Sequence, residues 1–159
     1  MKQKILIFLN PFRIENPTRE QQTEFLYENM MASNAFGNMG DELDYKELPK
    51  TEKELITFIK TKIREEKPEW IIATELSATV LAAIKIPNRI LINPAITFND
   101  LNNVPDHVRQ TTHGFFSESH EDNYTRFSSV YPNSMLTLDP EVDYETIAAL
   151  IKSIITDKE

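Results

Sequence analysis

One stretch of the sequence decides the fold: Trp70-Ile71-Ile72-Ala73-Thr74-Glu75-Leu76-Ser77-Ala78-Thr79. Its first half is a short apolar run rich in β-branched residues, which is typical of a strand buried on both faces. Small residues follow, and the segment then continues as a short helix to Ile84. A buried strand that passes through a tight turn directly into a helix predicts an α/β unit of a parallel sheet.

The turn in this stretch can be compared with Gly-x-Ser-x-Gly, the strand-turn-helix motif that holds a nucleophilic serine above an open sheet. In that register Ala73 and Ser77 take the two glycine positions, and Glu75 takes the position of the serine. The sequence therefore predicts the turn without its attacking hydroxyl group.

Strands and helices are expected to alternate along the whole chain. The expected strands span residues 5–9, 42–48, 69–73, 89–92, 111–116 and 134–138. The expected helices span residues 18–33, a segment capped by Thr51, residues 76–84, residues 121–130, and a final amphipathic segment capped by Asp143. This alternation favours an α/β three-layer sandwich with a mostly parallel sheet of about six strands. With no repeat or linker in the sequence, we expect a single domain over residues 1–159.

Composition and charge limit the kinds of partner. The chain has 159 residues, 40% of them hydrophobic, so it is long enough to bury a core without disulfides or metals. The net charge of -8 disfavours binding to a nucleic-acid backbone, which requires clustered Lys and Arg. No segment has the length of a membrane span, and the first apolar run is too short for a signal peptide. The absence of cysteine fits a reducing compartment, and we expect a cytoplasmic protein.

The turn around Glu75 and two later motifs, in this order, resemble the small YqiA-like esterases of the α/β-hydrolase superfamily. The later motifs are Ile90-Leu91-Ile92-Asn93-Pro94-Ala95 and the block from Gly114-Phe115-Phe116 to Tyr131-Pro132. The resemblance covers most of the chain. It implies a minimal α/β-hydrolase-like fold and an ancestral esterase activity.

The same resemblance implies that every position of the catalytic triad has changed. Glu75 falls on the serine, His120 or a neighbour falls on the acid, and Asp139-Pro140 falls where the histidine belongs. Leu9-Asn10-Pro11-Phe12 matches the first motif of the family, with Asn10 and Pro11 in place of His-Gly. The chain is therefore expected to be a degenerate member that lacks the Ser-Asp-His triad.

Candidate site residues follow from the chemistry of an acyl-transfer site. An ionised carboxylate is a poor acyl acceptor, so Glu75 is expected to be silent, or to act as an acid, base or ligand contact beside His113 or His120. Ser77 is the serine nearest the turn, although a small residue there is also explained by close packing of helix on strand.

Further candidates border the same pocket. The backbone N–H groups of Leu76 and Phe12 are candidates for an oxyanion-type site, and Asn10 and Asn93 for the pocket wall. Asn93 is also expected to close the turn after its strand. The three histidines show no metal-site spacing, so we expect no metal and no cofactor.

Three hypotheses about function remain open. The leading one is a catalytically inactive or strongly diverged α/β-hydrolase-fold protein that binds a small molecule or a protein partner. The alternative is an active esterase-like hydrolase with a non-standard constellation around Glu75, Ser77 and a histidine. The third is an interaction module without any ligand.

Overall fold

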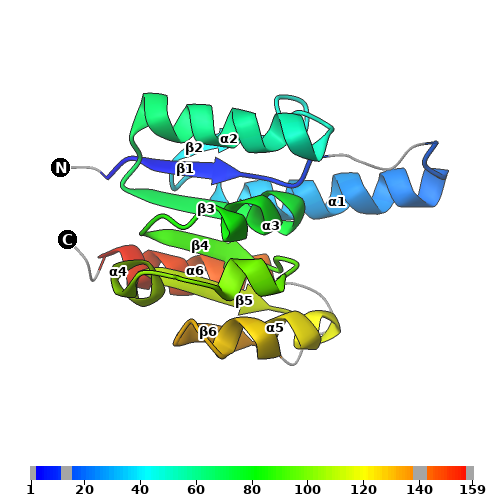
Figure 1. Cartoon of the computed structure of the whole chain (residues 1–159). Helices are drawn as coiled ribbons and strands as arrows, with labels where there is room; N and C mark the ends of the chain where they lie inside the picture. The colour runs from blue at the N-terminus through cyan, green and yellow to red at the C-terminus, as the bar shows by residue number, and fades with distance from the viewer. Residues whose placement is uncertain (1–2, 12–15, 138–142, 157–159) are drawn as a thin grey trace.

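The computed structural model describes residues 3–11, 16–137 and 143–156. Within these residues six strands form one parallel sheet in the order β2-β1-β3-β4-β5-β6 (Figure 1). The strands are β1 (Ile5–Phe8), β2 (Asp41–Leu43), β3 (Trp70–Thr74), β4 (Arg89–Ile92), β5 (Thr112–Phe116) and β6 (Asn133–Leu136). All five pairings between neighbouring strands are parallel. The predicted parallel sheet of about six strands is thus confirmed.

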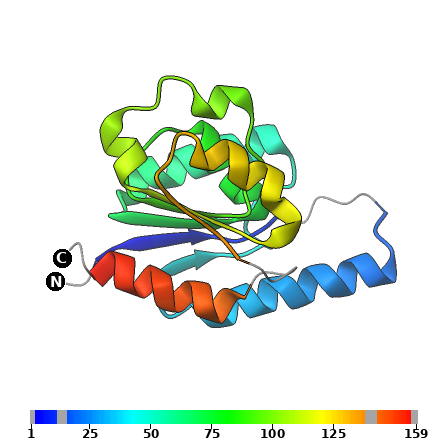
Figure 2. The ribbon, with the colours of Figure 1, turned by 90° about the horizontal axis from the view of Figure 1, so that it is seen from below.

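Helices cover both faces of the sheet (Figure 2). One face packs against α1 (Arg19–Phe36) and α6 (Tyr144–Thr156). The other packs against α2 (Glu52–Glu66), α3 (Glu75–Ala83), α4 (Asp106–Gln110) and α5 (Glu121–Ser128). Two short 3₁₀ helices, η1 (Phe98–Leu101) and η2 (Glu118–His120), follow β4 and β5. The predicted α/β three-layer sandwich is therefore confirmed.

Side chains of each inner strand alternate between two separate cores. In β1, Leu6 and Phe8 face the core under α2 and α3, whereas Ile5 and Ile7 face the core under α1 and α6. All four are buried. Because neither face of such a strand meets water, its sequence is continuously apolar rather than alternating.

Helix boundaries agree with the predicted caps. The Thr51 hydroxyl accepts a hydrogen bond from Glu54 N at 3.3 Å at the start of α2. Asp143 Oδ1 accepts one from Thr146 N at 3.2 Å at the start of α6. Each satisfies a backbone N–H that has no partner inside its own helix. None of the helices among the described residues is long and apolar enough to cross a membrane.

The strand expected over residues 42–48 is mostly wrong. Only Asp41–Leu43 pairs with β1, because the Asp44 side chain accepts a hydrogen bond from Lys46 N at 2.8 Å and folds the chain into a turn. Leu48 N also donates to Asp44 O. Leu43 and Leu48 are both buried in the same core, so the apolar spacing that suggested a strand spans a strand end and a turn.

Candidate functional site

Glu75 directly follows β3 and is the first residue of α3. Figure 1 shows the bend between these two elements. Its φ is 52°, in the left-handed region that residues with a side chain rarely adopt. A glutamate is destabilised there by about 1 kcal/mol, whereas a glycine is not. The bend predicted from the sequence is present, and it places a carboxyl group at the edge of the sheet where ligands of α/β proteins bind.

Glu75 borders a cavity of about 310 Å³ at this edge of the sheet, which we call the carboxyl-edge cavity. Parallel strands end at one common edge, so the residues that follow β3, β4 and β5 meet there. Helix α1 and the first residue of α6 complete the wall. The lining residues are Glu24, Tyr27, Glu28, Met31, Glu75, Asn93, Ser117, Ser119, His120 and Tyr144.

The Glu75 carboxyl group holds its proton unusually well. Its pKa is raised from 4.5 to about 7, chiefly by burial and also by the nearby charge of Glu28, and a hydrogen bond from the Asn93 side chain opposes this rise. The protonated and ionised forms of Glu75 are therefore both populated near neutral pH. A carboxyl group in this state can donate or accept a proton.

A hydrogen-bonded group links the ends of β4 and β5. Asn93 has a φ of 52°. Its Oδ1 accepts a hydrogen bond from Ser117 N at 2.9 Å, and its Nδ2 donates to Ser117 Oγ at 3.2 Å. His120 Nδ1 lies 3.2 Å from Ser117 Oγ and 3.1 Å from Ser119 Oγ. Burial lowers the pKa of His120, so its imidazole is neutral at physiological pH.

Tyr144 brings a phenol to the same cavity from the start of α6. Burial raises its pKa, and the charges of Glu75 and Glu28 add to that effect. The hydroxyl group therefore stays protonated and can donate a hydrogen bond to a ligand. The ring packs edge-on against Phe36, with the ring centroids 5.8 Å apart, which fixes its position.

The structure brings together two of the four candidate catalytic residues, Glu75 and His120. His113 lies in the first half of β5, where it pairs with Ile90 and Asn133. Its ring is 6.2 Å from the Trp70 ring, and it lines a separate cavity of about 400 Å³ beside β6 and α6. A pairing of His113 with Glu75 is therefore wrong.

Ser77 is fully buried, and its hydroxyl group donates a hydrogen bond to Leu9 O at 2.8 Å. This bond ties α3 to the end of β1, so the residue is structural.

We expect Ser77→Ala to reduce the free energy of unfolding by about 1–2 kcal/mol because Leu9 O is left without this donor. Chemical denaturation measures this change. Thr125→Ala on the exposed side of α5 is the control. If the fully folded Ser77→Ala protein lacked a hydrolytic activity that the wild-type protein has, this result would contradict a purely structural role.

The remaining candidates border the bend or lie elsewhere. Leu76 N donates a hydrogen bond to Asn10 Oδ1 at 3.4 Å, so the N–H expected to serve an oxyanion already has a partner. Asn10 lines a narrow recess that also contacts Glu75. Phe12 and the Asp139-Pro140 stretch lie outside the described residues.

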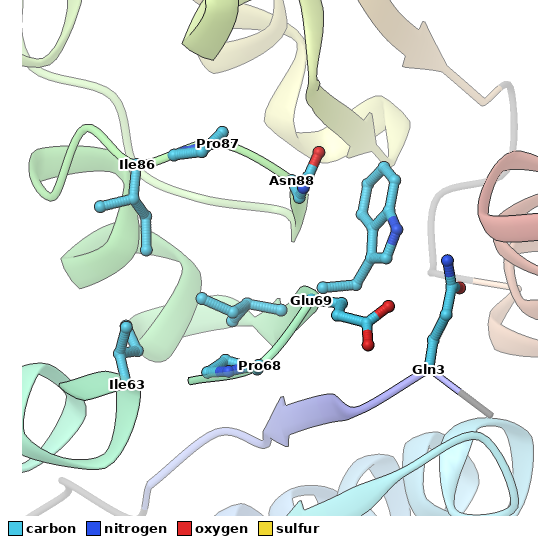
Figure 3. A pocket seen from close by; sticks show the side chains of 9 residues that line it. Gln3, Ile63, Pro68, Glu69, Ile86, Pro87 and Asn88 are labelled. Atoms are coloured by element: carbon cyan, nitrogen blue, oxygen red, sulfur yellow. The ribbon is translucent and has the colours of Figure 1, made fainter. Parts of the chain in front are cut away.

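A cavity of about 420 Å³ lies at the opposite, amino edge of the sheet (Figure 3). Its polar side chains are the amides of Gln3 and Asn88, the indole of Trp70 and the carboxylate of Glu69; the other lining residues are apolar or proline. It has no hydroxyl or imidazole group among its lining residues. Only the carboxyl-edge cavity, of these two, combines carboxyl, hydroxyl and imidazole groups in its lining.

The sequence did not identify the contribution of α1 or of Tyr144. Glu24, Glu28 and Met31 follow the spacing of one helix face, and this face turns toward the cavity. The pair Glu24 and Glu28, two acidic residues on one face of a helix that packs on the sheet, is the sequence signal that could have indicated this contribution. Which strand ends this face meets is decided only by the packing of α1 on the sheet.

Among the described residues no group of three or more His, Asp or Glu side chains could hold a metal ion. The sequence matches no protein-family model, and no curated protein is significantly similar to it.

Proposed function

We propose that this chain is a diverged, non-hydrolytic protein of α/β-hydrolase-like fold that binds a small molecule in the carboxyl-edge cavity. The observation that carries the proposal is the carboxyl group of Glu75, held at a left-handed bend and facing a cavity of about 310 Å³. Cavities of this size accommodate small organic ligands.

Two properties of the site argue against serine-type hydrolysis. A carboxylate stands where the attacking hydroxyl would be needed, and its negative charge would repel a developing oxyanion. The nearest serine of the turn, Ser77, is buried and points to Leu9 O rather than into the cavity. A protein that binds its ligand without acyl transfer needs neither a hydroxyl group at the bend nor a serine facing the cavity.

The polar groups of the cavity are held in place before any ligand arrives. Asn93 is fixed by its two hydrogen bonds with Ser117, and the Ser117 hydroxyl lies within hydrogen-bonding distance of His120 Nδ1. Groups fixed in this way lose little freedom on binding, which favours affinity. These fixed polar groups favour a small polar molecule as the ligand.

The proposal is tested by a ligand-observed NMR screen of the full chain against a library of small polar molecules. Binders are expected to be lost in Ser119→Trp, which places an indole at the cavity wall. They are expected to persist in Glu118→Trp, whose exposed side chain does not line the cavity. A screen without binders, or binders that both variants retain, would contradict the proposal.

A second candidate function is an esterase-like activity, favoured by the contact of His120 Nδ1 with the Ser119 hydroxyl at 3.1 Å. This is the distance at which a base accepts the proton of a nucleophile. We expect short p-nitrophenyl esters to be hydrolysed no faster than in buffer. Turnover that His120→Ala abolishes would replace the binding function with this one.

A further inference from the structure

We propose that the carboxyl-edge cavity binds its ligand through a primary ammonium group, held by the carboxylate of Glu75 and by acceptor oxygens of α1. The inference rests on the proposed small-molecule binding and names the chemical class of the ligand. It follows from the charge of the lining, from an acceptor atom without a donor, and from the aromatic side chains.

The ionisable groups of the lining favour a cation. Glu24, Glu28 and Glu75 contribute carboxyl groups, and none of the described lining residues is Lys or Arg. The remaining ionisable groups, His120 and Tyr144, are neutral at physiological pH because burial lowers the pKa of the first and raises that of the second. An anionic ligand would therefore meet only repulsion from charged side chains, and a cation would meet attraction.

A second observation is independent of the carboxylates. Asn29 on α1 is only 7% exposed, and its Nδ2 donates a hydrogen bond to Phe25 O at 3.0 Å. Within the described part of the chain its Oδ1 accepts no hydrogen bond. A buried acceptor without a donor destabilises the fold, so such an atom indicates a partner that arrives from outside.

The position of this acceptor connects it to the cavity. Asn29 lines a narrow recess together with Glu28, Glu75 and Tyr144, and these last three also line the carboxyl-edge cavity. A primary ammonium carries three N–H donors, and here it would meet acceptors from two elements, the bend and α1.

Aromatic and apolar side chains provide for the rest of such a ligand. Tyr27 and Tyr144 bring rings from α1 and α6, and Met31 brings a flexible thioether. Rings attract both a cation and the CH₂ groups next to it. A volume of about 310 Å³ suits an amine of a few carbon atoms rather than a large polycation.

The ionisation of Glu75 gives the inference a pH signature. Its carboxyl group has a pKa of about 7, and the groups that surround it are Glu24 and Glu28 on α1, His120 on η2 and Tyr144 on α6. Alkylamines stay protonated over the range from pH 6 to pH 8. Affinity is therefore expected to increase about tenfold between pH 6 and pH 8 as Glu75 loses its proton.

The experiment compares three probes of equal chain length, n-butylammonium, 1-butanol and butyrate, by calorimetric titration of the full chain at pH 6 and pH 8. Only n-butylammonium is expected to bind, about tenfold more tightly at pH 8. Glu75→Gln is expected to weaken its binding at pH 8 at least tenfold and to remove the pH dependence. Asn29→Leu, checked for folding by circular dichroism, is expected to weaken binding as well, and Glu20→Gln outside the cavity is the matched control.

Each other outcome decides against the inference. Binding of butanol or butyrate as tight as that of the amine, or amine binding that Glu75→Gln leaves unchanged, overturns the ammonium assignment. Absence of binding by all three probes also overturns it. In each case the NMR screen with Ser119→Trp reports separately on the cavity, so neutral or anionic binders found there would leave the proposed function standing.

Discussion

Replacing Glu75 with glutamine is expected to stabilise the protein at pH 8 by about 3 kcal/mol and to have little effect at pH 4. The reason is the pKa of Glu75, which burial raises to about 7 in the folded protein from 4.5. The folded state therefore binds this proton more tightly than the unfolded chain. The stabilising contribution of the protonated form is complete below about pH 4.5 and is lost as the pH rises through 7.

Urea denaturation of both proteins at several pH values between 4 and 8 measures this difference. Glutamine has nearly the shape of protonated glutamate and cannot ionise, so the difference between the two curves isolates the one charge. Glu20→Gln, which removes a charge from the exposed surface of α1, is the control. A difference that stays constant with pH would mean that the ionised carboxylate is as well solvated in the fold as in water.

Glu75→Gly separates the backbone contribution from the charge. Glycine adopts the φ of 52° without strain. The free energy of unfolding of Glu75→Gly is therefore expected to exceed that of Glu75→Gln by about 1 kcal/mol at every pH, and the entropy that glycine adds to the unfolded chain reduces this difference. The bend thus carries a residue that is unfavourable both in backbone conformation and in charge. Such costs are typical of positions that serve function rather than stability.

Replacing Arg89 with methionine is expected to reduce the free energy of unfolding by about 3 kcal/mol. Arg89 begins β4 and is fully buried. Its Nε donates to Thr112 Oγ1 at 2.9 Å and its Nη2 to the Tyr131 hydroxyl at 2.7 Å. Its Nη1 donates to Leu81 O and to Ile84 O, at the end of α3. The guanidinium thus replaces the donors that α3 lacks at its carboxyl end.

Methionine approximates the volume of the aliphatic part and removes every side-chain donor, so the carbonyl groups of Leu81 and Ile84 keep only their backbone donors, Ile84 N and Ile86 N. Tyr131→Phe is the graded control, because it removes only the hydroxyl group and is expected to cost about 1–2 kcal/mol. Chemical denaturation at pH 7 measures both. Wild-type stability in Arg89→Met would show that the cost of burying the charge, which also lowers the pKa of Arg89, cancels the gain from its hydrogen bonds.

The periodicity of the sequence was sufficient for most elements, and it failed where a side chain redirects the backbone. Apolar runs located β1, β3 and β4 because strands buried on both faces carry apolar residues at nearly every position, with Thr74 and Arg89 as the polar exceptions. The segment after Leu43 was misassigned because Asp44 turns the chain through a local hydrogen bond to Lys46 N. Apolar spacing does not reveal such a bond, although an aspartate in that position permits it.

What the sequence by itself determined is the alternation of strands and helices and the bend that carries Glu75, since both depend on neighbouring residues. Only the tertiary structure decided that His120 joins Glu75 at one cavity, that His113 does not, and that Glu28 and Asn29 of α1 complete the wall. These contacts join segments far apart in the chain. They depend on the strand order and on how α1 and α6 pack on the sheet, and the pKa of Glu75 depends in turn on that packing.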